Sequence, residues 1–185
     1  RKSFLKSLKD EQKHFKLYLE RIREFGMDFG DRPLNYVFWK QTPKIDTIEK
    51  FAAIVGITFE GANLDYSILY SKIFRHFGDE KCAAIMDIIY KDEISHVKRG
   101  LYVIRHSENY SGSDWIAYNS YLDERFTPRR AKGYYYFPES RRKAGMDENF
   151  IKELGIYSDE FSRRKVQTIA QEVLDDKSFQ TEFIL

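Results

Sequence analysis

The sequence predicts an all-α protein, a helical bundle with a long crossover connection and an irregular, partly helical C-terminal extension. Two long segments place apolar residues at the 4-3-4-3 spacing of helices in a bundle. Each segment also contains one DExxH motif, Asp-Glu-Gln-Lys-His at 10–14 and Asp-Glu-Ile-Ser-His at 92–96. A Glu and a His three residues apart share one helix face. Each motif can therefore offer a carboxylate and an imidazole to a metal held between facing helices.

The first helix is expected over residues 3–25. Its 4-3-4-3 positions predict a buried seam that includes the first motif glutamate, with members Phe4, Leu8, Glu11, Phe15, Tyr18, Ile22 and Phe25. Residues 26–45 contain two glycines and two prolines and predict a long connection with little regular structure. Such a length suits the crossover that joins two helical hairpins.

The second and third helices are expected to form a hairpin. Asp46 or Thr47 can cap a helix that runs to about Phe77, Gly78 marks the turn, and the next helix covers residues 79–107. The seam of this last helix points both motif residues inward, with members Cys82, Met86, Ile89, Glu93, His96, Gly100 and Val103.

Glu60 is a third candidate ligand. It lies in an apolar run, on one face with Ala53, Ile57 and Leu64. It precedes Gly78 by about as many residues as Glu93 and His96 follow it, so an antiparallel hairpin brings all three groups to one depth. Buried charges are costly unless they are paired. A divalent metal is the favoured partner, and a buried salt-bridge network is the alternative.

The chain divides into a bundle core over residues 1–110 and an extension over 111–185 that packs on it within the same domain. A short helix is expected at 114–125, and two final helices are expected at 147–155 and 158–177. Between 124 and 143 basic residues alternate with aromatic ones, a pattern that can bind phosphates and stack bases. This Arg125–Lys143 segment is therefore a candidate RNA contact. The alternative is a solvated arm whose aromatic residues pack over the bundle.

The composition bears on the cellular location of the protein and on its binding partners. The net charge of +2 is too small to indicate nucleic-acid binding by itself. The single cysteine, Cys82, cannot form an internal disulfide, which favours a reducing cytoplasmic location. No apolar run reaches membrane-spanning length and no signal peptide is visible, so no membrane partner is expected.

Three segments, DEQKHF (10–15), FEGANLD (59–65) and KDEISHVKRG (91–100), resemble an uncharacterised bacterial ferritin-like family, a domain of unknown function. Segment 131–146 also resembles that family's downstream region. A more distant similarity is to di-iron hydroxylases that modify tRNA. The resemblance implies a ferritin-like bundle. It implies five metal ligands, Glu11, His14, Glu60, Glu93 and His96, and makes Asp10 and Asp92 acceptors for the N–H of the opposite histidine. The alternative for both aspartates is an exposed helix charge.

The family also has a helix before the first motif, and that helix supplies another glutamate. These 185 residues, which begin at Arg1, contain three of the carboxylates and both histidines. We expect the remaining carboxylate to lie upstream in the natural gene product or on another chain, and an oligomer stays possible.

Carboxylates with two histidines favour two iron ions, or a manganese–iron pair. The leading hypothesis is an O₂-dependent oxidase or oxygenase acting on an unknown small substrate. Tyr18 and Tyr90, each one turn from a motif residue, are weaker catalytic candidates, and packing is the alternative for both. The other functional hypotheses are an RNA-modifying hydroxylase, iron handling without an organic substrate, and a non-catalytic metal-binding or interaction protein.

Overall fold

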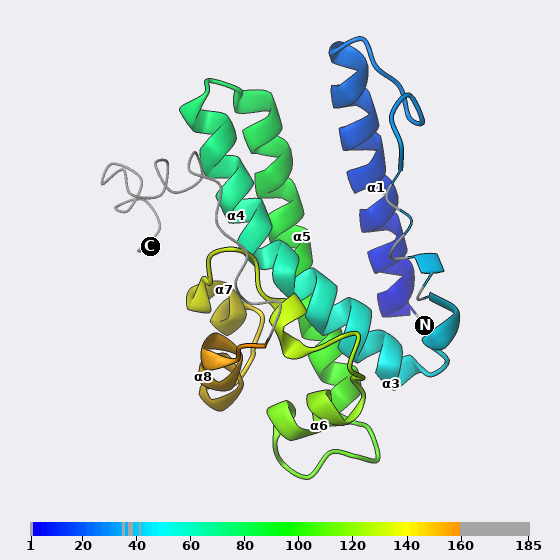
Figure 1. The fold of residues 1–185 in the computed structure, drawn as a ribbon, viewed down its shortest axis with the longest axis vertical. Coiled ribbons are helices and arrows are strands. Elements are labelled where there is room, and N and C mark those ends of the chain that lie inside the picture. Colours follow the sequence, from blue (N-terminus) through cyan, green and yellow to red (C-terminus); the bar gives the residue numbers. More distant parts are fainter. Residues whose placement is uncertain (1, 35, 37–38, 41, 160–185) are drawn as a thin grey trace.

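The computed structural model describes residues 2–34, 36, 39–40 and 42–159. Over these residues the regular structure is helical and contains no strand, which confirms the predicted all-α bundle (Figure 1). None of the described helices is both long and apolar enough to cross a membrane. The elements in order are α1 (Lys2–Glu24), η1 (Thr42–Lys44), α3 (Ile48–Phe51), η2 (Ala52–Phe59), α4 (Glu60–His76), α5 (Glu80–Arg105), α6 (Asp114–Ser120), η3 (Pro128–Ala131), α7 (Pro138–Lys143) and α8 (Glu148–Ile156).

The predicted hairpin of the second and third helices is confirmed by α4 and α5, which lie side by side in Figure 1. Gly78 takes a φ of 76°, and its N–H donates to the Arg75 carbonyl at 2.9 Å, which ends α4. Asp79 then caps α5 by accepting from the backbone N–H of Cys82 at 2.9 Å. At the start of α3, Thr47 accepts from the N–H of Lys50, so the predicted cap is also present.

A π-helical segment, η2, joins α3 to α4, and the sequence pattern did not predict it. Its widened turns end at Phe59, directly before Glu60. On this segment Gly56 meets Gly100 of α5 so closely that a Cβ at Gly100 would lie 3.0 Å from the Gly56 carbonyl carbon. The two backbones therefore cross with no side chain between them, close to the candidate ligands Glu60 and His96.

Helix α1 packs antiparallel on α5, but not through the predicted apolar seam. Leu8, Phe15 and Phe25 are 55%, 49% and 57% exposed. The face that contacts α5 is one residue earlier in the register and is polar: Asp10 and His14 reach His96 and Asp92, and further along Arg21 reaches Cys82 and Asp79. The contact face thus lies between the predicted seam, which still supplies Glu11, and the positions one residue earlier, because polar pairs rather than apolar packing set this interface.

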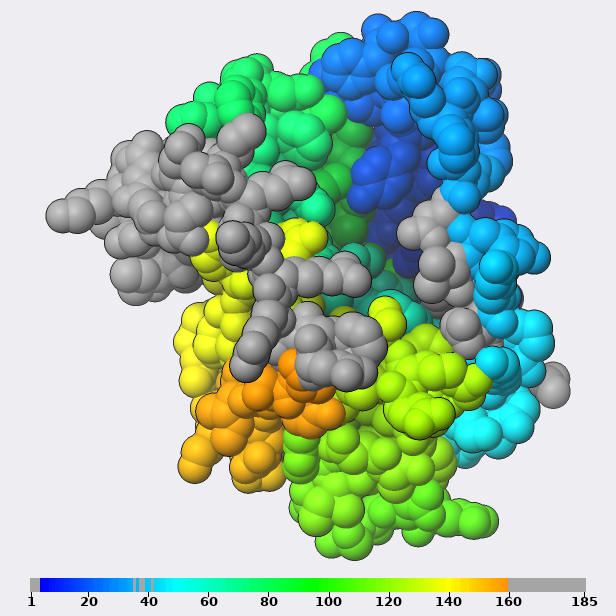
Figure 2. Space-filling view, in the orientation of Figure 1, coloured from blue at the N-terminus to red at the C-terminus, as the bar shows by residue number. Residues whose placement is uncertain are grey.

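The apolar core lies between the α4–α5 hairpin and the C-terminal extension. In Figure 2 the extension (yellow-green to orange) and α1 with its following connection (blue) occupy opposite sides of the molecule. The predicted helix at 114–125 is shorter than expected and ends at Ser120, whereas α8 confirms the predicted helix near 147–155. The helix expected at 158–177 falls on residues that, from 160 on, lie outside the described part of the chain.

A buried ion pair ties the extension to α4. Asp65 and Arg141 are 1% and 0% exposed, and Arg141 Nη2 donates to Asp65 Oδ2 at 2.8 Å. Asp65 also accepts from the backbone N–H groups of Gly133 and Phe137, each at 2.9 Å. Arg141 in turn donates to the carbonyl of Gly61 at 2.9 Å, next to Glu60. The pair therefore fixes the first turn of α4.

Replacing Gly100 by Ala tests the backbone crossing. The new methyl group meets backbone on η2, so we expect a loss of about 1–2 kcal/mol in the free energy of unfolding, measured by urea denaturation, after allowing for the better helix propensity of alanine. Gly61→Ala is the matched control, since its Cβ would meet nothing closer than 3.5 Å. Equal stability of the two variants would contradict the account of the crossing.

Replacing Asp65 by Ala tests the buried pair. Removing it leaves the Arg141 guanidinium buried and unpaired, and we expect a loss of about 3–5 kcal/mol in the free energy of unfolding. Glu139→Ala, which removes one partner of the exposed Arg142, is the control and should change stability by less than about 1 kcal/mol. A small effect of the Asp65 substitution would mean that the extension is held by apolar packing alone.

Candidate metal centre

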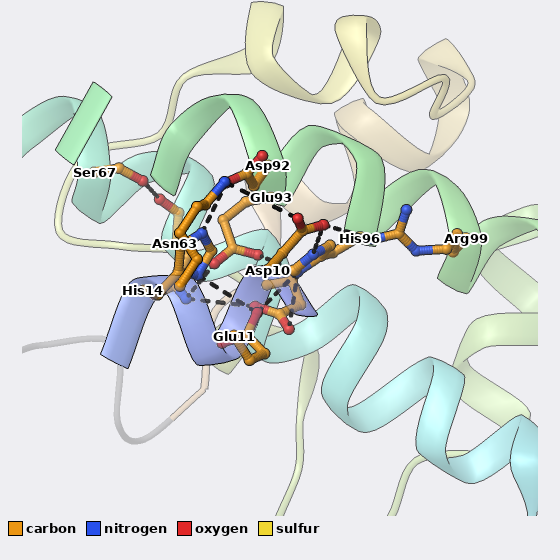
Figure 3. Close-up of polar contacts among 11 residues, drawn as sticks. Asp10, Glu11, His14, Asn63, Ser67, Asp92, Glu93, His96 and Arg99 are labelled. Carbon is orange, nitrogen blue, oxygen red and sulfur yellow. Dashed lines mark hydrogen bonds and ion pairs between the residues drawn. The ribbon is translucent and has the colours of Figure 1, made fainter. Parts of the chain in front are cut away.

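Four predicted ligand residues meet between α1, α4 and α5. The carboxylates of Glu11, Glu60 and Glu93 and the imidazole of His96 each offer one ligand atom, and these four atoms lie within 4.8 Å of one another. Figure 3 shows the side chains from α1 and α5 converging on the same point. The equal depth predicted for Glu60, Glu93 and His96 on the hairpin is therefore what the structure shows.

His96 is the centre of this group. Its Nδ1 lies 2.9 Å from Glu93 Oε2, 3.2 Å from Glu11 Oε1 and 3.6 Å from Glu60 Oε1. Yet both His96 Nδ1 and Glu93 Oε2 are buried without a hydrogen bond, because their geometry does not align a donor with an acceptor. Buried polar atoms are rarely left in this state, so they need a partner of another kind.

His14 and the two aspartates form a crossed arrangement. His14 Nε2 lies 2.9 Å from Asp92 Oδ2, and His96 Nε2 lies 3.3 Å from Asp10 Oδ2, so each histidine contacts the aspartate of the other motif. A proton on Nε2 then donates to the carboxylate and leaves Nδ1 free to act as a ligand. His14 Nδ1 lies 3.6 Å from Glu11 Oε1, at one side of the four-ligand group.

Charge in the group is unbalanced. Burial raises the pKa of Glu93, and the Glu60 carboxylate raises it further. Burial alone lowers the pKa of His96, but its contacts with Glu11, Glu60 and Glu93 raise it overall. Burial would also raise the pKa of Glu11, yet the two histidines outweigh this effect and lower it to about 2. The group therefore favours protons on Glu93 and His96, which a divalent cation could replace.

Two contacting residues were not among the predicted ones. Asn63 donates to Glu60 Oε2 at 3.4 Å and to Glu93 Oε1 at 3.3 Å, and so holds two ligand carboxylates in place. Its spacing of three residues from Glu60 was the available signal. Arg99, one turn after His96, has its Nη2 3.8 Å from Asp10 Oδ2, and burial lowers its pKa. Lys13 pairs with Asp92 at the rim of the site.

The two candidate tyrosines lie in different places. Tyr18 is about half exposed, and burial together with the nearby Glu93 and Glu11 raises its pKa to about 12. Tyr90 instead packs against the apolar core, and its hydroxyl lies 3.2 Å from Ser140 Oγ of α7. Of the two, Tyr18 is the one whose electrostatic surroundings include the ligand carboxylates.

The basic aromatic segment serves the fold in part and lines a pocket in part. Arg141 is part of the buried ion pair with Asp65. Lys132 donates to the carbonyls of Gly155 and Tyr157 at 2.9 and 2.8 Å. A pocket of about 300 Å³ lies between this segment and α4, and basic and aromatic side chains line it, among them Tyr66, Arg129, Arg130, Lys132 and Tyr134. Asn63 lines the same pocket.

Comparison with known proteins agrees with the resemblance in part. Residues 1–152 match a family described as "Protein of unknown function (DUF455)". An "Uncharacterized protein" of Haemophilus influenzae is 29% identical over 101 residues, which are 54% of this chain and 35% of the relative. The match thus spans about a third of that relative's length. No solved structure matches the chain. Because the family model covers most of the sequence, the chain belongs to this DUF455 family.

Proposed function

We propose that Glu11, Glu60, Glu93 and His96 bind a divalent transition-metal ion. The observation that carries this proposal is the pair of buried atoms, Glu93 Oε2 and His96 Nδ1, that have no hydrogen-bond partner inside a group of four ligand atoms. Ligands lie roughly 2.0–2.2 Å from such an ion. Opposite ligands are then up to about 4.4 Å apart, and because the four atoms all lie within 4.8 Å of one another, binding needs only small side-chain adjustments.

A salt-bridge network explains the site less well. At the Asp65–Arg141 pair both carboxylate oxygens accept hydrogen bonds from backbone and guanidinium groups. In the candidate centre Glu60 and Glu93 accept only long hydrogen bonds, at 3.4 and 3.3 Å, from the neutral Asn63 amide. For positive charge the three carboxylates share one imidazole and at most the edge of a second. Since buried carboxylates must be paired or bound to a cation, a metal ion balances this group where the protein's own cations do not.

The proposal extends to a ferritin-like dinuclear centre. In such bundles two helices each carry an Glu-x-x-His motif and two others each carry one Glu. The chain supplies both motifs and Glu60. His14 would then bind a second ion, Glu11 would be shared between the two ions, and a further carboxylate from a segment outside these 185 residues or from another chain would complete the second site.

Carboxylate and imidazole ligands favour iron or manganese. Two such ions, when bound, would supply the capacity to activate O₂, and we propose an O₂-dependent oxidase or oxygenase. The chain's own residues have defined tasks in this proposal. Asp10 and Asp92 orient the imidazoles, Asn63 orients two carboxylates, and Tyr18 borders the site. The cytoplasmic setting expected from the composition stays a prediction.

Metal loading of the metal-free chain tests the centre directly. We expect equilibrium dialysis against ferrous or manganous ion, followed by elemental analysis, to find one tightly held ion per chain. His96→Ala should weaken binding at least about tenfold, and Asp10→Asn about 10–100-fold through the imidazole that it orients. His14→Ala should keep the ion. His106→Ala, an exposed histidine just past α5, is the matched control. Full retention of metal by His96→Ala would contradict the proposed site.

RNA modification is a second candidate function, favoured by the basic aromatic pocket beside Asn63. Bases can stack on Tyr66 and Tyr134 while Arg129 and Arg130 contact phosphates. Asn63 links this pocket to the ligand carboxylates, so a base held there would lie next to the proposed metals.

Reversing the charge of Arg130 tests the RNA hypothesis. Binding of total tRNA should weaken, and the slope of log affinity against log salt should fall in magnitude by about 1, because one phosphate contact is lost. Arg125→Glu is the control, since Arg125 is exposed in the same segment but pairs with Asp123 outside the pocket. Arg141 is unsuitable because its reversal breaks the buried pair. Identical salt slopes for both variants would eliminate this candidate.

A further inference from the structure

A mainly apolar cavity of about 290 Å³ ends at the proposed metal ligands. It is bounded by α1, by α3 and η2, and by α5. Leu8, Phe51 and Val55 supply apolar walls, and Glu11, Glu60 and His96 lie at its end. The Gly56–Gly100 crossing forms part of the wall, so bare backbone faces the cavity there. The shape suits a small ligand with an apolar body, since ligand sites are concave, mostly apolar and carry few polar groups.

One charged side chain of this cavity is incompletely hydrogen-bonded. Arg99 lines it, and the side chain is 16% exposed. Its Nε and Nη2 atoms are buried and make no hydrogen bond. The Asp10 oxygen at 3.8 Å from Nη2 is too distant for one. Figure 3 shows Arg99 one helical turn beyond His96, at the border of the cluster.

A buried guanidinium without hydrogen bonds is costly. Arg141, which serves the fold, is better satisfied: its Nη2 has a carboxylate and two backbone carbonyls as acceptors, and only its Nε lacks a hydrogen bond. Arg99 has no equivalent set among the described residues. The planar fork of an arginine matches a carboxylate, which can accept two parallel hydrogen bonds.

We propose that this cavity binds a small carboxylic acid, with the carboxylate on Arg99 and the hydrocarbon part between Leu8, Phe51 and Val55. A monoanion fits better than a phosphate dianion, because Asp10 and Glu60 are close to Arg99 and repel excess negative charge. The ligand's carbon atoms would then lie beside the metal ligands. Its role as the substrate rests on the proposed metal function, whereas its binding rests on the cavity and Arg99 alone.

The test uses the metal-free chain with hexanoate and hexan-1-ol as probes, followed by calorimetry and by NMR titration. Hexanoate should bind more tightly than hexanol. Arg99→Gln should weaken hexanoate binding by about tenfold or more, as expected for a lost charged hydrogen bond, and leave hexanol unchanged. Lys98→Gln is the matched control, because it removes one exposed positive charge from the neighbouring position of α5. Val55→Phe should fill the cavity and block both probes.

Circular dichroism of each variant establishes that it folds. Arg99→Lys keeps the positive charge but loses the planar guanidinium, so it should bind hexanoate with intermediate affinity. Equal binding of hexanoate and hexanol, or hexanoate binding that Arg99→Gln leaves intact, overturns the proposal. Metal dialysis is measured separately. Hexanoate binding without metal binding would refute the substrate role alone, and metal binding without hexanoate binding would refute the cavity proposal alone.

Discussion

The burial of ionisable ligands between three helices is the constraint on which the rest of the structure depends. Glu93 and His96 point into the bundle from α5, and Glu60 and Glu11 approach from α4 and α1. Glu93 and His96 are almost fully buried, whereas Glu60 is partly exposed and Glu11 is half exposed. The buried groups keep their places only if their positions are fixed and their charge is balanced. The glycine crossing of η2 and α5 sets the helix spacing next to them, and the Asp65–Arg141 pair anchors the turn of α4 that carries Glu60.

Two buried charge clusters in the same protein show opposite chemistry. Asp65 and Arg141 pair with each other and with the nearby backbone, which leaves only the Arg141 Nε without a hydrogen bond, and their pairing attaches the extension. Glu93 and His96 keep atoms without hydrogen bonds, and Arg99 beside them does too. Because every buried polar group has a cost, a cluster that leaves four buried atoms without hydrogen bonds, where the Asp65–Arg141 pair leaves one, indicates a place for ligands.

The sequence was sufficient to predict the α4–α5 hairpin and the common depth of its candidate ligands, because both depend on local signals. These signals are the Thr47 cap, the Gly78 turn and the rise per residue of a helix. It was insufficient for the orientation of α1, because the apolar 4-3-4-3 pattern identifies a stripe and not its partner. Polar contacts between the helices, such as that of His14 with Asp92, determine which face of α1 packs on α5. The Asp65–Arg141 pair joins residues 76 positions apart, and the π-helical turns of η2 have no periodic signature, so neither could be read locally.

Anomalous diffraction from crystals of the chain loaded anaerobically with ferrous iron tests the central claim most directly. The account predicts a peak at the iron absorption edge within about 2.0–2.2 Å of ligand atoms from Glu11, Glu60, Glu93 and His96, with a second, weaker position on the side of His14 when a further carboxylate is present. A fully loaded crystal with its iron elsewhere on the surface, and with Glu93 and His96 hydrogen-bonded only to each other, would contradict it.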